Sequence, residues 1–225
     1  LVDHTADLSL AARRIVFGKF LNAGQTCVAP DYILVEKAVK MPLLAALQNA
    51  ISQFYGRNAL YNPDYPKIIN AKHFNRLQGL LAGQTVFCGG KSIEPTVLED
   101  VSPESAVMRE EIFGPLLPVL ALDSIDEMIS FVRRRPKPLA LYLFTSSQNT
   151  KRRVLRTLSF GGGCVNDTII HLASTRLPFG GVGESGMGSY HGKKSFDTFT
   201  HYKSIVKKAT WLDLPMRYPP YTDKK

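Results

Sequence analysis

LLPVLALDSIDEMISFVRRRPKPLALYLFT, residues 116–145, is the stretch that decides the fold. It opens with an apolar run that is typical of a buried strand. Ser124 and Glu127 then have the S-x-x-E spacing of a helix capping box, which predicts a helix as far as Arg134. A second apolar run, Leu139–Thr145, follows. Strand, helix and strand in this order indicate a parallel βαβ unit, so the sequence predicts α/β architecture.

The same alternation of helical and extended patterns continues on both sides of this stretch. We expect helices over residues 7–20, 43–55, 67–81 and about 149–158. We expect strands over residues 32–35, 85–88, 95–98, 116–122 and 164–166, and a last extended piece over Ser204–Lys208. The chain should therefore fold as one α/β domain with an appendage near its end.

Composition places the chain in the globular class. Of its 225 residues, 44% are hydrophobic and 21% are charged, which is enough to build a core without disulfides. The sequence has no apolar run of 18 residues and no secretory start, so we expect a soluble, cytoplasmic protein without a membrane anchor in this chain. Three cysteines without CxxC spacing and five histidines without ligand spacing predict no metal site.

The net charge of +9 is concentrated in two segments. Residues 133–156 carry eight basic groups and no acid, and residues 193–225 carry eight basic groups and three acids. We interpret the first segment as the solvated ends and faces of two helices, since no nucleic-acid-binding motif accompanies it. The alternative is a basic interaction module that binds nucleic acid or anionic lipid.

Cys27 is the residue whose position most suggests chemistry. It follows a Gly-Gln-Thr turn between an expected helix and an expected strand, where loops on α/β scaffolds often carry nucleophiles. The alternative is a small packed side chain, and that interpretation is favoured for Cys88 and Cys164, which lie in expected strands. If Cys27 were instead the nucleophile of a thiol hydrolase or acyltransferase, it would need a histidine partner, for which His171 and His191 are candidates.

Two further motifs are candidates for ligand binding. Residues 181–186 match G-x-G-x-x-G, but no apolar strand precedes them and no carboxylate follows at the usual offset, so we reject a dinucleotide fingerprint. We interpret them as a tight glycine loop beside Phe179. The run Glu110-Glu-Ile-Phe-Gly-Pro115 places two carboxylates before a buried strand. These carboxylates are either solvated turn residues or groups that hold a ligand hydroxyl.

Taken together, four motifs in consistent order closely resemble the aldehyde dehydrogenase superfamily, and details near the end resemble its class 3 branch. They are Gly24–Tyr32, Glu110–Pro115, Val165–Asp167 and Leu177–Gly188. The resemblance implies an open, twisted, mostly parallel sheet with helices on both faces, and a C-terminal oligomerisation strand. It also implies oxidation of an aldehyde to a carboxylic acid with NAD or NADP, in a homodimer paired through residues 204–208.

The resemblance also implies residue roles. Cys27 matches the nucleophile, which forms a thiohemiacetal and then a thioester, and its backbone amide matches half of the oxyanion site. Glu111 matches the carboxylate that holds the nicotinamide ribose, and Phe113 the aromatic residue beside the nicotinamide. Phe179 is expected near the active-site pocket.

The expected division is a catalytic domain over residues 1–195 and an oligomerisation strand with a tail over residues 196–225. The resemblance places the cofactor-binding domain, the general-base glutamate and the second oxyanion donor before Leu1, outside this chain. Because each of these groups ordinarily contributes a large rate factor, we expect the isolated chain to be nearly inactive.

Overall fold

The computed structural model describes residues 1–221 and contains a mostly parallel sheet. Four strands lie in the order β1-β4-β3-β2. Strand β4 pairs in parallel with both β1 and β3, whereas β2 runs antiparallel to β3 at the edge. The strands are β1 (Ile33–Glu36), β2 (Thr85–Cys88), β3 (Thr96–Glu99) and β4 (Leu116–Leu122).

A second pair of parallel strands, β5 (Ala140–Leu143) and β6 (Gly162–Val165), lies beside this sheet. The first residues of the chain join the two. Val2 bridges in parallel to Val35 on one side and to Phe144 on the other. Four backbone hydrogen bonds of 2.8–3.2 Å make these links. The first residues of the chain thus join the two sheets into one open sheet. This confirms the predicted fold class, an open, mostly parallel α/β sheet.

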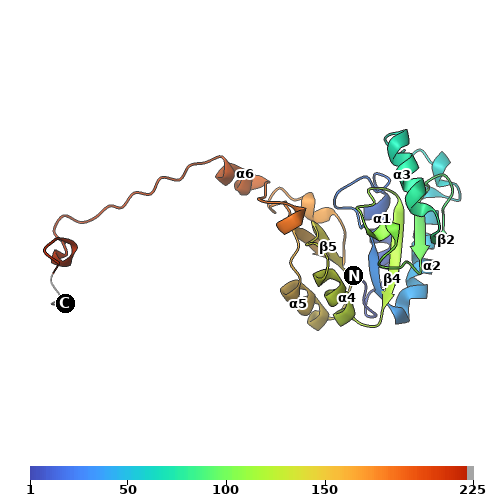
Figure 1. Ribbon diagram of the computed structural model, residues 1–225, viewed down its shortest axis with the longest axis horizontal. Coiled ribbons are helices and arrows are strands. Elements are labelled where there is room, and N and C mark those ends of the chain that lie inside the picture. The colour runs from blue at the N-terminus through green and yellow to red at the C-terminus, as the bar shows by residue number, and fades with distance from the viewer. Residues whose placement is uncertain (222–225) are drawn as a thin grey trace.

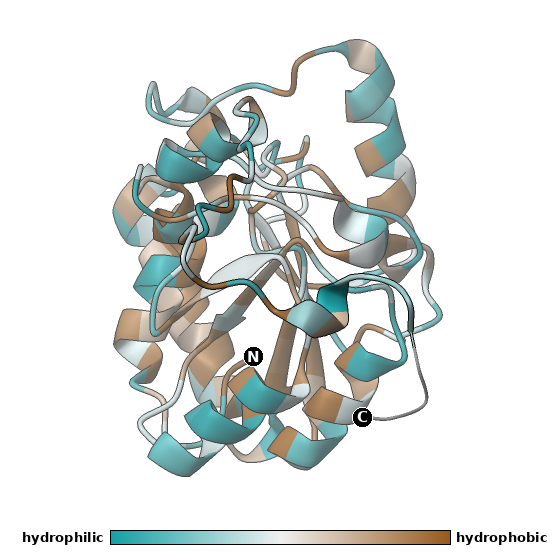
Figure 2. Ribbon diagram, turned by 90° about the vertical axis from the view of Figure 1, so that its left-hand side faces the viewer, coloured by the Kyte–Doolittle hydropathy of each residue, from teal (hydrophilic) through white to brown (hydrophobic). Residues whose placement is uncertain are grey.

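Helices cover both faces of the sheet, as Figure 1 shows. Side chains of β1 and β4 alternate between the two cores. Ile33 and Val35 face a cluster that includes α1 and α2, whereas Leu34 faces one that includes α3, α4 and α5. The helices are α1 (Leu8–Phe20), α2 (Lys40–Tyr55), α3 (Ala71–Leu81), α4 (Ile125–Arg133), α5 (Gln148–Thr157) and α6 (Gly192–Thr198). In Figure 2 the hydrophobic colour is concentrated on the strands and the inner helix faces.

Capping side chains set where several helices begin. Asp7 accepts a hydrogen bond from the Leu10 N–H at 3.0 Å, which starts α1 where the sequence predicts it. Asn70 accepts one from the His73 N–H at 2.9 Å, so α3 begins at Ala71 and not at residue 67. Helix α2 begins at residue 40, before the expected 43, because a proline is tolerated in a first helical turn.

Half of the predicted capping box forms at the start of α4. The Ser124 hydroxyl accepts from the Glu127 N–H at 3.3 Å, as expected. The Glu127 carboxylate reaches one residue further back and accepts from the Asp123 N–H at 2.9 Å. The helix start is therefore where the motif puts it, although the reciprocal bond is shifted.

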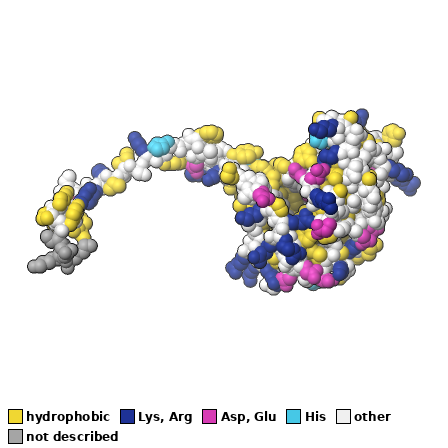
Figure 3. All heavy atoms as spheres, in the orientation of Figure 1, with side chains coloured by type: hydrophobic (Ala, Val, Ile, Leu, Met, Phe, Trp, Pro, Cys, Tyr) yellow, Lys and Arg dark blue, Asp and Glu magenta, His cyan; other side chains and the backbone are white. Residues whose placement is uncertain are grey.

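The basic residues of segment 133–156 lie largely on exposed faces of α4 and α5, where dark blue side chains gather in Figure 3. Arg153 forms an ion pair with Asp126 across the two helices. Arg135 differs from this pattern. It is only partly exposed and donates to the carbonyls of Met108 and Pro103 at 3.1 and 2.9 Å.

An extended arm follows α6 and runs away from the body of the molecule (Figure 1). Residues 204–208 are exposed and form no strand within residues 1–221, and their expected pairing as a strand with a second copy stays a prediction. A strand needs a neighbour for its backbone groups, and none of the described residues lies beside it. No helix within residues 1–221 is long and apolar enough to span a bilayer.

Candidate active site

Cys27 lies in the loop between α1 and β1, and its side chain is exposed. Gln25 ties this loop to a neighbouring segment. Its amide nitrogen donates to the Lys67 carbonyl at 3.2 Å, and its amide oxygen accepts from the Ile69 N–H at 3.0 Å. No hydrogen bond from the Cys27 backbone N–H to another of residues 1–221 is present. The loop is thus held from one side while the thiol and this N–H are both available.

Glu111 and Phe113 lie in the loop that leads into β4. Two residues clamp this loop. Asp31 accepts from the Ile112 N–H at 3.1 Å, and Arg76 of α3 donates to the Ile112 carbonyl at 2.6 Å. Phe113 has a positive φ of 44°, an unusual conformation for a bulky residue, and its side chain is 40% exposed. The clamps hold this conformation and leave the ring accessible.

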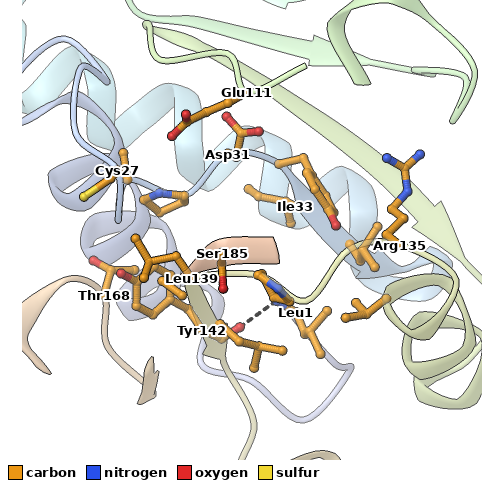
Figure 4. Close-up of a pocket in the computed structure, with 18 of the residues that line it drawn as sticks. Leu1, Cys27, Asp31, Ile33, Glu111, Arg135, Leu139, Tyr142, Thr168 and Ser185 are labelled. Atoms are coloured by element: carbon orange, nitrogen blue, oxygen red, sulfur yellow. Dashed lines mark hydrogen bonds between the residues drawn. The ribbon is translucent and has the colours of Figure 1, made fainter. Parts of the chain in front are cut away.

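A cavity of about 680 Å³ brings the two loops together. Cys27, Asp31, Glu111 and Phe113 all line it, and so does Tyr142. Figure 4 shows Asp31 and Glu111 together on one side of the cavity, with Cys27 nearby. Three of the four predicted site residues therefore share one cavity.

Phe179, the fourth predicted residue, does not line this cavity. It pairs with Tyr190 through two backbone hydrogen bonds of 2.9 and 3.0 Å, inside the glycine-rich segment. Its ring centroid lies 6.2 Å from that of His171, which in turn lies 5.8 Å from Tyr142. One ring, that of His171, therefore lies between Phe179 and Tyr142 of the cavity wall.

A buried lysine adds to the electrostatics of the cavity. Lys19 of α1 is 1% exposed, and burial lowers its pKa to about 8, against the opposing effect of Asp31 and Glu111. Burial raises the pKa of Asp31. Burial and then the neighbouring Asp31 raise the pKa of Glu111. The two carboxylates and the lysine thus form one interacting charge cluster.

Sequence reasoning missed Asp31 and Arg135, which line the cavity, and Lys19, which interacts by charge with Asp31 and Glu111. A signal for Lys19 was available, because it stands at i+4 from Ile15 on the buried face of α1, where a charged side chain needs a partner. Asp31 gave no such signal, since its partner Ile112 is 81 residues away. Arg135 stood in a basic run, which favoured a solvent-facing interpretation.

The two other cysteines differ from Cys27. Burial raises the pKa of Cys88 to about 11 and that of Cys164 above its usual value. The Cys164 sulfur lies 3.7 Å from Nδ1 of His171. No histidine within the described chain hydrogen-bonds to Cys27, so the thiol-hydrolase alternative lacks the partner it requires.

Two further expectations concern ligands. Residues 181–186 form a loop around a short 3-10 turn, Gly183–Ser185, and the segment before them contains an isolated bridge and no strand. This agrees with rejecting the dinucleotide fingerprint. Within residues 1–221 there is no group of three or more His, Cys, Asp or Glu side chains that could hold a metal ion.

The fold and this cavity define a class of α/β proteins with an exposed cysteine between a helix and a buried strand. The model of the aldehyde dehydrogenase family matches residues 1–205. The chain belongs to this family, which confirms the resemblance found in its motifs.

Relatives support the same assignment. The chain is 55% identical to 4,4'-diaponeurosporen-aldehyde dehydrogenase of Staphylococcus aureus over all of this chain and 50% of that protein. It is 47% identical to mouse aldehyde dehydrogenase family 3 member A2, over all of this chain and 48% of that protein. A bovine dimeric NADP-preferring aldehyde dehydrogenase is 46% identical over 97% of this chain and 95% of its own length. The chain thus spans about half the length of the first two relatives.

Solved structures agree. The substrate-bound state of Staphylococcus aureus AldH superposes with a TM-score of 0.92 at 54% identity, over 98% of this chain and 50% of that one. The NADP complex of an NADP-dependent glyceraldehyde-3-phosphate dehydrogenase from Bacillus halodurans gives a TM-score of 0.77 at 29% identity, over 86% and 43%.

Proposed function

We propose that the protein oxidises aldehydes to carboxylic acids with NAD or NADP, using Cys27 as the nucleophile. The observation that carries this proposal is the single cavity that contains Cys27, Glu111 and Phe113. An exposed thiol, a carboxylate and an accessible aromatic ring are the groups that this reaction requires in one place. Family membership supplies the reaction class.

In the proposed reaction, the Cys27 thiolate adds to the aldehyde carbon and forms a carbon–sulfur bond. The Cys27 backbone N–H, which has no acceptor among residues 1–221, donates to the developing oxyanion. A nicotinamide held by Glu111 and Phe113 would supply the hydride acceptor that oxidation of the thiohemiacetal to a thioester requires. Water then cleaves the thioester, releasing the acid and returning the thiol.

The residues present fit a nicotinamide nucleotide. Glu111 presents its carboxylate to the cavity, where it can accept hydrogen bonds from ribose hydroxyls. The Phe113 ring is exposed beside it and can contact a flat heterocycle. Nothing in these two residues distinguishes NAD from NADP.

The general base and the second oxyanion donor are assigned to residues outside this chain, as the family motifs imply. The 225-residue chain by itself should therefore be nearly inactive, since each of those groups ordinarily contributes a factor of about 10² or more. The full-length protein is the form in which activity should be measured. A cytoplasmic location stays a prediction.

The arm after α6 supports a homodimer. Ile205 and Val206 are 75% and 84% exposed, and the backbone around them has no strand partner within residues 1–221. We propose that residues 204–208 add as a strand to a sheet of a second copy. Edge pairing of this kind would bury both apolar side chains.

Substitution of the nucleophile tests the proposed function. In the full-length protein, Cys27→Ser should lower kcat for oxidation of a medium-chain aldehyde by about 10³-fold or more, because a hydroxyl is a far weaker nucleophile. Cys88→Ser is the control and should retain activity. Undiminished turnover in Cys27→Ser would refute the proposal.

A further inference from the structure

Tyr142 connects the second pair of strands to the loop that carries Cys27. Its hydroxyl donates to the carbonyl of Val28 at 2.7 Å, across 114 residues of sequence. Val28 is fully buried, and the tyrosine is 8% exposed. The hydrogen bond therefore satisfies a carbonyl that water does not reach, one residue after the thiol.

The rest of Tyr142 is held firmly. Its backbone pairs with Cys164 in the parallel β5–β6 ladder. The Leu1 nitrogen donates to its carbonyl at 2.7 Å, which is the dashed line in Figure 4. Its ring packs edge-on against His171 with centroids 5.8 Å apart. The hydroxyl is thus presented from a rigid strand, which makes it a fixed reference point for the neighbouring loop.

The Cys27 loop has few anchors of its own. Its internal bonds are turn bonds, such as the Ala29 N–H to the Thr26 carbonyl at 2.9 Å. Gln25 ties the loop to residues 67–69 before the cysteine. Tyr142 ties it immediately after the cysteine. The thiol therefore lies between two anchors that belong to different parts of the fold.

We infer that Tyr142 is a positioning residue for Cys27: its hydroxyl fixes the peptide between Val28 and Ala29, close behind the nucleophile, and keeps the thiol directed into the cavity. This inference rests on the proposed function of Cys27. Tyr142 does not touch the reacting atoms in this role. It acts through the Val28 carbonyl, and small displacements of a nucleophile are known to reduce turnover strongly.

The chain offers a matched control for testing this role. The Tyr65 hydroxyl also donates to a backbone carbonyl, that of Ile93, at 3.2 Å, and Tyr65 is likewise 8% exposed. Neither Tyr65 nor Ile93 lines the cavity. Tyr142→Phe and Tyr65→Phe each remove one buried tyrosine hydroxyl, so both should lose thermal stability, but only the first should affect Cys27.

The experiment compares both variants in the full-length protein by steady-state kinetics and by hydrogen exchange of backbone amides. Tyr142→Phe should lower kcat about tenfold or more while KM changes less than about threefold. Amides of residues 22–31 should exchange faster in this variant, whereas those of α2 should not. Tyr65→Phe should leave kcat and exchange in residues 22–31 as in the wild type.

A donor-restoring variant keeps the test decisive if Tyr142→Phe folds poorly. Replacing Tyr142 by p-aminophenylalanine retains an N–H donor and should recover kcat and slow exchange in residues 22–31. If kcat stays at the wild-type value in Tyr142→Phe, or falls equally in Tyr65→Phe, the positioning role is refuted. If Cys27→Ser keeps full activity, the proposed function fails, while the exchange data still report whether Tyr142 holds the loop.

Discussion

Gly24 of the Cys27 loop lies directly against the carbonyl of Gly114, in the loop that carries Glu111 and Phe113. A Cβ added at Gly24 would lie 2.1 Å from the Gly114 oxygen. Gly24 also has a positive φ of 73°, which L side chains rarely adopt. The loop of the proposed nucleophile and the loop of the proposed cofactor-holding residues thus touch through backbone at this point, and the side chain of Asp31 joins them at a second one.

Gly24→Ala should therefore destabilise the protein and separate the two loops. The substitution places a side chain on a residue with left-handed backbone conformation, which strains the backbone. The added Cβ also clashes with the Gly114 carbonyl, which is backbone and cannot rotate away as a side chain could. Gly83→Ala is the control, because Gly83 has a φ of 74° but open space around its Cβ position. Denaturant unfolding should show a loss of about 1 kcal/mol for Gly83→Ala and a clearly larger loss for Gly24→Ala. Equal losses would mean that the contact with Gly114 is unimportant.

Alkylation should distinguish the three cysteines. Limiting iodoacetamide followed by peptide mapping should label Cys27 first, because it is exposed. Cys88 and Cys164 should react slowly, since burial raises both of their pKa values and so reduces the reactive thiolate. Equal labelling of all three would count against an accessible nucleophile. Cys27→Ala should leave only the slow reactions.

The buried Lys19 predicts a pH dependence of stability. Its pKa falls to about 8 in the folded protein, below the 10.5 of an ordinary lysine. Between these two pH values the folded state releases the proton while the unfolded state keeps it, so the free energy of unfolding should rise with pH, by at most about 3 kcal/mol. Below pH 8 the lysine is charged in both states and contributes no slope.

The measurement is denaturant unfolding of wild type and Lys19→Met across this range. The wild type should gain stability relative to Lys19→Met as the pH rises. Lys72→Met, at an exposed position, is the control and should follow the wild type. A constant difference between wild type and Lys19→Met would show that Lys19 does not titrate there.

Pairing through the arm after α6 predicts that the protein is a dimer in solution. Ile205→Asp with Val206→Asp should convert a dimer into monomers in sedimentation experiments, because two charges cannot be buried in a paired strand. Met216→Asp changes an arm residue that is 71% exposed and lies outside residues 204–208, so it should leave the dimer intact. Monomeric wild-type protein would contradict the proposed pairing.

Local signals predicted the elements well because they act within a few residues. Strand β4 has the predicted bounds, and Ser124 caps α4 as its spacing indicates. The predicted Lys67 start of α3 was wrong because Asn70 caps the helix later. Local patterns also place Cys27 in a loop between a helix and a strand.

The contacts that complete the site could not be predicted in this way. The hydrogen bond between Tyr142 and Val28 joins positions 114 residues apart. Hydrophobic periodicity describes neighbouring residues only, so it cannot predict such a pair. The bridging role of Val2 rests on a single residue, too short to show the alternation of a strand. The unusual φ of Phe113 is held by Asp31 and Arg76 from other elements.

The bridge made by Val2 also orders events during synthesis. In a nascent chain, Val2 can pair with β1 as soon as Val35 has left the ribosome. The second bridge of Val2 can form only after Phe144 has been added, which happens far later. Until then the side of Val2 that faces Phe144 lacks its neighbour and stays open to wrong partners. Completion of the central sheet is therefore a late, long-range step, and translation pauses between these two points should raise the yield of aggregated protein.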